Sequence, residues 1–150
     1  ERFGVAADVW SATSYNELRR EALACDRWSF LHPDQPKRVP YVTQVLKDQP
    51  YPVIATCDYI KAVPDQIARW VPGGLFPLGT DGFGRSEARA ELRDYFEIDA
   101  NYVTLAALQQ LAERGEFDRA KLPGVMKQLD INPDKVNPLV PPKPETLPAE

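Results

Sequence analysis

A glycine-rich turn that follows a short apolar run constrains the fold of this chain more than any other segment. The run Leu75–Leu78 predicts a strand, and residues 79–84 then read GTDGFG before a helical pattern begins at Ser86. Three glycines within those six positions permit backbone angles that are closed to other residues. A strand that turns tightly into a helix is a basic unit of an α/β fold.

Strand and helix signals alternate along the rest of the chain. Strands are predicted at residues 5–12, at residues 52–57 and at Leu75–Leu78. Helices are predicted after Ser14, over residues 39–47, after Cys57 with Pro64 in the first turn, after Ser86, over residues 101–114 and over residues 117–129. This alternation predicts an α/β layer fold with a largely parallel sheet and helices on both faces. We expect Trp10 and Trp28 to be largely buried in it.

The clearest helix start lies at Ser14, where Ser14-Tyr15-Asn16-Glu17 forms the S-x-x-E pattern of a capping box. The residues that follow place Leu18, Ala22 and Cys25 on one face, at spacings of four and three. That spacing is typical of an amphipathic helix packed against a core.

Both ends of the chain suggest boundaries. Residues 1–4 resemble the last turn of a helix closed by Gly4, so we expect the chain to be a piece of a longer protein whose preceding strand lies upstream. Six of the fifteen prolines follow Asn132, a density that disfavours regular structure. We therefore expect an α/β domain over residues 1–131 and a Pro-rich extended tail over residues 132–150.

Composition excludes several classes of protein. The net charge of −4 gives no general attraction to nucleic acid or to an anionic membrane, and no apolar run approaches the roughly 20 residues that span a bilayer. Cys25 and Cys57 are the only cysteines and do not make a disulfide framework, which favours a reducing cytoplasm and buried, inert thiols. The single histidine, His32, has no cluster of ligating residues beside it, so no metal site is expected.

The glycine turn itself has three possible interpretations. Dinucleotide binding is disfavoured, because Gly79-x-x-Gly82-x-Gly84 lacks the G-x-G-x-x-G spacing and Asp81 would repel a pyrophosphate. A simple structural turn, capped by Ser86 and followed by Glu87 at the positive end of a helix, explains most of the residues. In the third interpretation the side chains project from the turn and form an interface, and the candidate interface residues are Asp81, Phe83 and Arg85.

Catalytic equipment is nearly absent. Only His32 could serve as the base of a hydrolytic triad, and it lies in a proline-bracketed loop. Asp58 follows a predicted strand at its carboxyl end, where open α/β sheets bind ligands, but a cap or turn role explains it as well. We predict no catalytic, cofactor-binding or metal-binding residue in this chain. From the residues alone, an enzyme accessory domain and an interaction module both remain open.

Several segments together resemble the C-terminal domain of the homodimeric pyruvate dehydrogenase subunits, which are thiamine-diphosphate-dependent decarboxylases. The order of TSYNELRR, DYIKAVPDQI and TDGFGRSEAR makes the resemblance specific, and it extends over roughly residues 5–137. Transketolases carry a looser version of the glycine turn. The matching segments are ADVWSATSYNELRREA, VPYVTQVL, PVIATCDYIKAVPDQI, LGTDGFGRSEARAELRDYFEID and YVTLAALQQLAERGEFD.

The resemblance implies a three-layer, transketolase C-terminal-like domain with a mixed, mostly parallel sheet whose first strand precedes residue 1. It implies a parent subunit that oxidatively decarboxylates pyruvate and acetylates the lipoyl group of an acyltransferase. The family's magnesium motif and cofactor-activating glutamate are absent here, so thiamine diphosphate and magnesium would be bound by other domains and not by this one.

The same resemblance implies three partners for this domain: the remaining domains of the same subunit, the homodimer partner and the lipoyl acyltransferase. The domain's own role would be structural, in dimer packing and partner contact. The alternatives are the same domain of a related 2-oxo acid dehydrogenase or transketolase-like enzyme, and a non-catalytic interaction module.

Overall fold

Two parallel strands form the centre of the fold. The computed structural model describes residues 2–49 and 51–141. In it, β1 (Val53–Thr56) pairs with β2 (Leu75–Leu78), so that Val53 lies opposite Leu75 and Thr56 opposite Leu78. Parallel pairing requires a crossover between the strands, and this crossover carries α3 (Ala62–Asp65) and the 3₁₀ turn η1 (Ala68–Trp70). Two of the three predicted strands are thereby confirmed.

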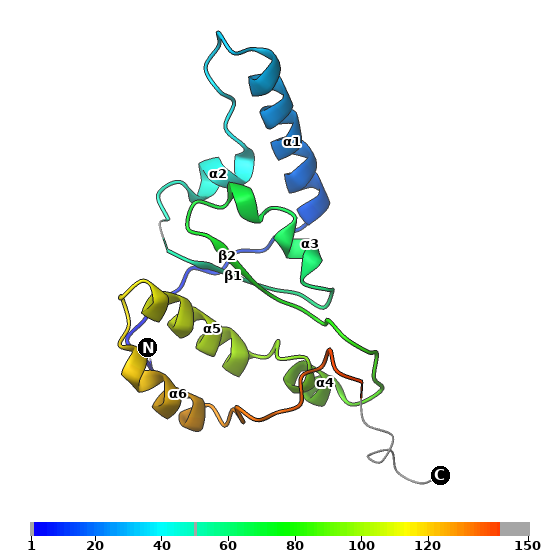
Figure 1. Ribbon diagram of the computed structural model, residues 1–150, viewed down its shortest axis with the longest axis vertical. Helices are drawn as coiled ribbons and strands as arrows, with labels where there is room; N and C mark the ends of the chain where they lie inside the picture. Colours follow the sequence, from blue (N-terminus) through cyan, green and yellow to red (C-terminus); the bar gives the residue numbers. More distant parts are fainter. Residues whose placement is uncertain (1, 50, 142–150) are drawn as a thin grey trace.

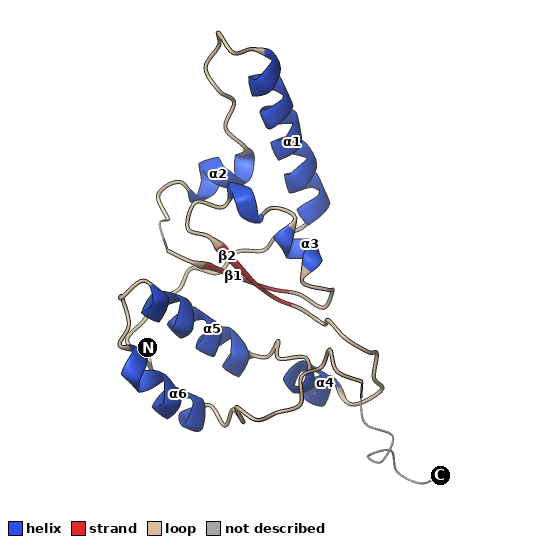
Figure 2. Cartoon of the chain, in the orientation of Figure 1, coloured by secondary structure: helices blue, strands red, loops and turns tan. Residues whose placement is uncertain are grey.

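Helices cover both faces of this sheet, as predicted, and give a three-layer α/β fold (Figures 1 and 2). On one side, above the strands in Figure 1, lie α1 (Tyr15–Leu31), α2 (Tyr41–Leu46) and α3. On the other side lie α4 (Arg89–Tyr95), α5 (Ala100–Glu113) and α6 (Leu122–Gln128), with the 3₁₀ turn η2 (Arg119–Lys121) before α6.

Alternate residues of each strand supply the two halves of the core, because successive side chains of a strand point to opposite faces. Val53 and Leu75 pack with buried Val42, Ile67 and Val71 on the α2 side. On the α5 side, the core consists of Ile54, Phe76, Leu78, Phe96, Ile98, Val103 and Ala106. A third cluster holds α5 and α6 together and comprises Leu108, Val125, Leu129 and Ile131.

The helix starts confirm one sequence signal and correct another. The Ser14 Oγ accepts a hydrogen bond from the Glu17 N–H at 3.2 Å, so the predicted N-cap of α1 is present. Ser86 does not cap the next predicted helix. The helix α4 begins three residues later, at Arg89, and Glu91 reaches back to accept from the N–H of Ala88 at 3.3 Å.

The predicted strand over residues 5–12 is wrong. None of the described residues pairs with this segment, which has no helix or strand, and Val9 is 95% exposed. A strand persists only where its backbone groups find partners on a neighbouring strand. Trp10 is accordingly 61% exposed, contrary to expectation. Trp28 is only half-buried, with its ring stacked at 4.5 Å on the His32 ring.

Two carboxylates of α1 attach this helix to the rest of the chain. Asp26 accepts a hydrogen bond from the indole N–H of Trp70 at 3.1 Å and also pairs with Arg69. Glu21 accepts from the N–H of Tyr41, at the start of α2, at 2.9 Å. The helical hairpin of α1 and α2, which projects from the sheet in Figure 1, is therefore held by polar contacts as well as by its apolar face.

The described part of the Pro-rich tail, residues 132–141, has no helix or strand, but it lies against the domain. The Asn132 and Asn137 side chains each accept from a backbone N–H two residues ahead, at 2.9 Å. Lys135 contacts α4 and α5. The division into a domain over 1–131 and a tail over 132–150 stays a prediction.

We predict that the two thiols differ in reactivity. Cys25 is only 9% exposed, and burial raises the pKa of its thiol, with a further rise from the neighbouring Glu21 carboxylate. A raised pKa lowers the thiolate fraction at any given pH, so Cys25 should react slowly with a thiol probe even at alkaline pH. Cys57, which was also expected to be buried, is half-buried. It should label about tenfold faster than Cys25 in the native state.

The measurement is time-resolved labelling of the native chain, with Cys57→Ser and Cys25→Ser used to isolate each thiol. Rapid native labelling in Cys57→Ser would contradict the buried position of Cys25.

Candidate functional site

The loops that follow the two strands meet at one edge of the sheet. Because β1 and β2 are parallel, their carboxyl ends lie side by side. The Thr80 N–H donates to the Tyr59 carbonyl at 2.8 Å, and the Thr80 hydroxyl donates to the Asp58 carbonyl at 3.3 Å. The Asp81 carboxylate accepts from the N–H of Lys61 at 3.0 Å. These bonds join the two loops into one unit and make Asp58 a backbone contact of the turn.

Two of the three glycines in this turn are required by close approach. A Cβ atom on Gly79 would lie 2.5 Å from the Tyr59 carbonyl oxygen. Gly82 has φ +118° and a Cβ there would lie 2.2 Å from the Pro138 carbonyl oxygen. Gly84 has no atom within 4 Å of such a Cβ and lies outside the left-handed region. A side chain would therefore be strained at Gly79 and Gly82, but not at Gly84.

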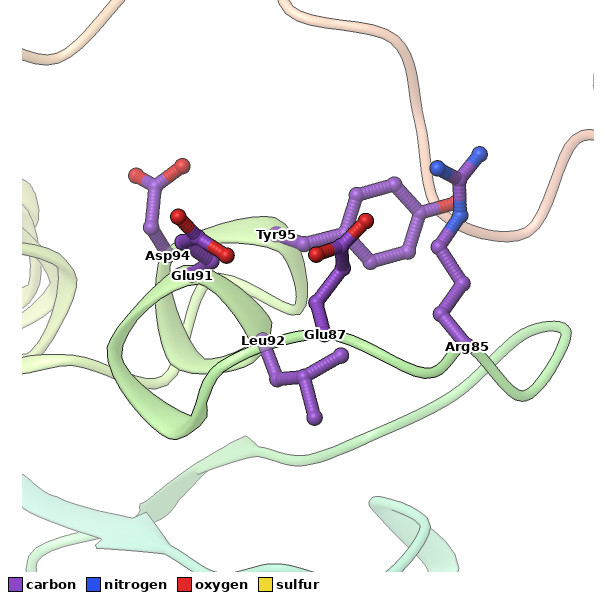
Figure 3. Close-up of a pocket in the computed structure, with 6 residues that line it drawn as sticks. All are labelled: Arg85, Glu87, Glu91, Leu92, Asp94 and Tyr95. Carbon is purple, nitrogen blue, oxygen red and sulfur yellow. The ribbon is translucent and has the colours of Figure 1, made fainter. Parts of the chain in front are cut away.

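The three candidate interface residues do not converge. Asp81 points inward and is half-buried against the loop after β1. Phe83 is 56% exposed. Arg85 is exposed, and its guanidinium carbon lies 4.3 Å from the centre of the Tyr95 ring on α4 (Figure 3). Asp81 thus fixes the shape of the turn, while Phe83 and Arg85 present the side chains that a partner could contact.

An open, acidic depression adjoins Arg85, with a volume of about 360 Å³. Figure 3 shows Arg85 beside Tyr95, with Glu87 near them and Glu91 and Asp94 farther along α4. The sequence reasoning missed this depression, although the positions 87, 91 and 94 carry acidic residues at helical spacing. Its lining is completed by Leu92.

A second, smaller depression of about 210 Å³ lies directly at the carboxyl edge, between the sheet and α4. It is lined by Asp58, Thr80, Arg89, Leu92, Arg93, Phe96 and Ile98. The edge therefore combines apolar groups with charges of both signs. That mixture suits contact with another protein surface, where aromatic residues and arginine are enriched.

The potential metal-ligating side chains of the described residues do not gather at one point. No group of three or more His, Cys, Asp or Glu side chains converges within residues 2–49 and 51–141. His32 lies at the far end of α1, where its Nδ1 is 2.8 Å from the Trp28 carbonyl oxygen. No helix in those residues is long and apolar enough to cross a membrane.

These features define a class of domain. The family model described as "Transketolase-like TK C-terminal domain" matches residues 1–99, and the chain belongs to this family. The α/β fold with a parallel sheet and helices on both faces agrees with that membership.

The chain is similar to proteins named pyruvate dehydrogenase E1 component, and this similarity confirms the resemblance found in the sequence. The chain is 48% identical over 138 residues to that of Pseudomonas aeruginosa and 47% identical over 137 residues to that of Escherichia coli K12, in each case over 91% of this chain. It is 51% identical over 114 residues, or 76% of this chain, to that of Mycobacterium tuberculosis. The match spans only 16%, 15% and 12% of these relatives' lengths.

We predict that Asp81 stabilises the turn. Asp81→Ala leaves the Lys61 N–H without its acceptor and should lower the free energy of unfolding by about 1 to 2 kcal/mol. Asp81→Asn keeps an oxygen acceptor and should cost less. The measurement is urea unfolding, with Glu87→Ala as the control because the exposed Glu87 carboxylate makes no hydrogen bond to a described residue. Equal stability of Asp81→Ala and the control would contradict this role.

Proposed function

We propose that this chain is the C-terminal domain of a thiamine-diphosphate-dependent pyruvate dehydrogenase subunit. The parent subunit would decarboxylate pyruvate oxidatively and acetylate the lipoyl group of an acyltransferase. The observation that carries this proposal is identity at nearly half of all positions, over 91% of the chain, with proteins named pyruvate dehydrogenase E1 component. A related 2-oxo acid dehydrogenase or transketolase-like enzyme is less well supported, because the family model alone would fit it equally.

Within that enzyme the domain acts by contact and not by chemistry. Thiamine diphosphate supplies the carbanion chemistry when bound, and its magnesium is held by side chains outside this chain. The domain then packs against the remaining domains of its subunit and against the homodimer partner, and borders the surface offered to the lipoyl acyltransferase.

The residues best suited to such contacts are Phe83 and Arg85, with Asp81 holding the turn beneath them. Large aromatic side chains and arginine are enriched at the energetic centres of interfaces. The turn is also pre-organised by the bonds of Thr80 and Asp81, which lowers the entropy lost on docking. Unpaired thiols at Cys25 and Cys57 favour a reducing, cytoplasmic setting for the assembly.

The test of the enzyme assignment is an assay of the full-length subunit with thiamine diphosphate and magnesium. We expect pyruvate to be consumed in preference to longer 2-oxo acids and to ketose phosphates. Preference for another 2-oxo acid or for a ketose phosphate would favour one of the related enzymes.

A further prediction concerns the chain alone. Residues 1–150 should neither bind thiamine diphosphate with magnesium nor consume pyruvate, because the required donor set lies outside them. Isothermal titration calorimetry of the isolated chain is the measurement, with the full-length subunit as the positive control. Saturable binding at micromolar cofactor would contradict the prediction.

The interface role of the turn predicts that Arg85→Ala weakens assembly of the full-length subunit. Loss of an interfacial arginine should raise the dimer dissociation constant about tenfold while leaving the fold intact. Sedimentation velocity at falling concentration measures this, beside circular dichroism and a pyruvate assay. The matched control is Arg20→Ala, since Arg20 is exposed on α1 and pairs only with Glu17 among the described residues. Wild-type assembly and activity of Arg85→Ala would exclude this role.

A further inference from the structure

The helix α1 exposes apolar side chains on the face that turns away from the domain. Its inner face is buried through Ala22 and Cys25. On the opposite side Phe30 is 82% exposed, Leu31 is half exposed and Leu23 is 36% exposed. Single exposed apolar residues are common at protein surfaces, but a cluster of them on one helix marks a surface for interaction. In Figure 1 this helix projects away from the sheet.

Two arginines lie among these apolar residues. Arg19, Leu23, Arg27 and Phe30 are spaced by four, four and three residues, so they form one row along the helix. Leu31 lies beside this row, four residues after Arg27. The five residues are here called the outer stripe. Arg19 and Arg27 are both exposed, and neither forms an ion pair or a hydrogen bond with a described residue through its side chain. The stripe therefore alternates cationic and apolar groups.

The fold separates the charges of α1. The helix contains three acidic and three basic residues, so its sequence is electrically balanced. Glu21 and Asp26, however, accept hydrogen bonds from α2 and from the Trp70 indole. Glu17 pairs with Arg20. The two arginines of the outer stripe are thus left without a carboxylate, on a chain whose net charge is −4. An acidic partner would be attracted to this stripe and repelled by the chain as a whole.

The chemistry of the stripe favours a protein partner. Arginine is enriched at protein interfaces and lysine is depleted there, and α1 has three arginines and no lysine. The guanidinium group also binds a carboxylate through two parallel hydrogen bonds. Arg19 and Arg27 are eight residues apart, or about 12 Å along the helix axis. Carboxylates at a similar separation, as on two turns of a second helix, would meet both arginines.

Other occupants fit the stripe less well. A helix that lies on a membrane keeps its apolar residues on one face and its cations on the other. In α1 the two kinds alternate along the same stripe, and the fully apolar face is already buried in the domain. Binding to nucleic acid depends on neutralising several phosphates, which two arginines on an acidic chain do not achieve.

We propose that the outer stripe of α1 docks an acidic helical segment of another protein. Carboxylates of that segment pair with Arg19 and Arg27, and its apolar side chains cover Leu23, Phe30 and Leu31. This surface is separate from the glycine turn, and the proposal does not depend on which reaction the parent enzyme catalyses.

The probe is a fluorescent helical peptide that carries two glutamates eight residues apart, with leucines between them on the same face. A second peptide has glutamine in place of both glutamates. Fluorescence anisotropy with the full chain should show saturable binding of the glutamate peptide, and about tenfold weaker binding of the glutamine peptide. Added salt should weaken the first interaction, because it screens exposed charges. Equal affinity for the two peptides, or no saturable binding of the glutamate peptide, overturns the proposal.

Matched variants test the stripe itself. Arg27→Gln should weaken binding of the glutamate peptide about tenfold, whereas Arg119→Gln, an equal change of charge at an exposed position of η2, should not. Phe30→Ala should also weaken binding, but leave the free energy of unfolding unchanged because Phe30 is exposed. Val9→Ala is its control, since Val9 is exposed and lies outside α1. Wild-type affinity in Arg27→Gln or Phe30→Ala overturns the proposal, as does a loss of stability in Phe30→Ala that accounts for the weaker binding.

Two further measurements identify a different occupant. Tighter binding to vesicles of phosphatidylserine and phosphatidylcholine than to the peptide, lost in Phe30→Ala, would assign the stripe to a membrane surface. Self-association of the full chain in sedimentation velocity, abolished by Arg27→Gln, would assign it to a second copy. Either result overturns the proposal of an acidic protein partner.

Discussion

The parallel register of β1 and β2 is the constraint on which the rest of the structure depends. Thr56 lies opposite Leu78, so the two strands end together and the loops that follow them start side by side. A shift of one residue would exchange the faces of both core clusters, because side chains alternate along a strand. It would also separate Thr80 from the Tyr59 carbonyl. The register of the two strands therefore determines both the core packing and the geometry of the turn.

The helix α4 connects the edge of the sheet to the surface of the domain. Tyr95 of α4 contacts Arg85 after the turn, Asp94 binds Lys135 of the Pro-rich tail, and Leu92 lines both depressions at the edge. Because α4 is only seven residues long, its position depends on packing and on Glu91 at its first turn, not on helix propensity. A short helix held at both ends is well suited to fix a surface for contact.

The loops at the carboxyl edge of the sheet carry residue types that are enriched at protein interfaces. The carboxyl edge of its sheet is where open α/β folds bind ligands, and here it presents Phe83, arginines and acidic groups. Away from the turn, Asp26 binds the Trp70 indole and so attaches α1 to the segment after α3, and Glu21 joins α1 to the start of α2. Both arrangements agree with the proposed role of this domain, which is to pack against other parts of the enzyme.

The sequence by itself determined the local features, because they depend on neighbouring residues. The Ser14 cap, the buried face of α1, and the strands at Leu75–Leu78 and within residues 52–57 all follow from short spacings. The family could also be predicted from the sequence, because the order of several motifs is specific to it. Strand propensity over residues 5–12 was misleading, because it cannot supply the neighbouring strand that hydrogen bonding needs.

Only the tertiary structure decided which residues of the turn matter and why. Gly82 and Gly84 lie in the same glycine-rich turn, and only Gly82 is constrained, by its φ of +118° and by the approach of Pro138. Asp81 turns inward because the Lys61 N–H lies beneath it, and Lys135 binds Asp94 and Tyr102. These contacts join segments that are far apart along the chain. The packing of the layers decides which of these residues meet, and the spacing of residues along the chain does not encode that packing.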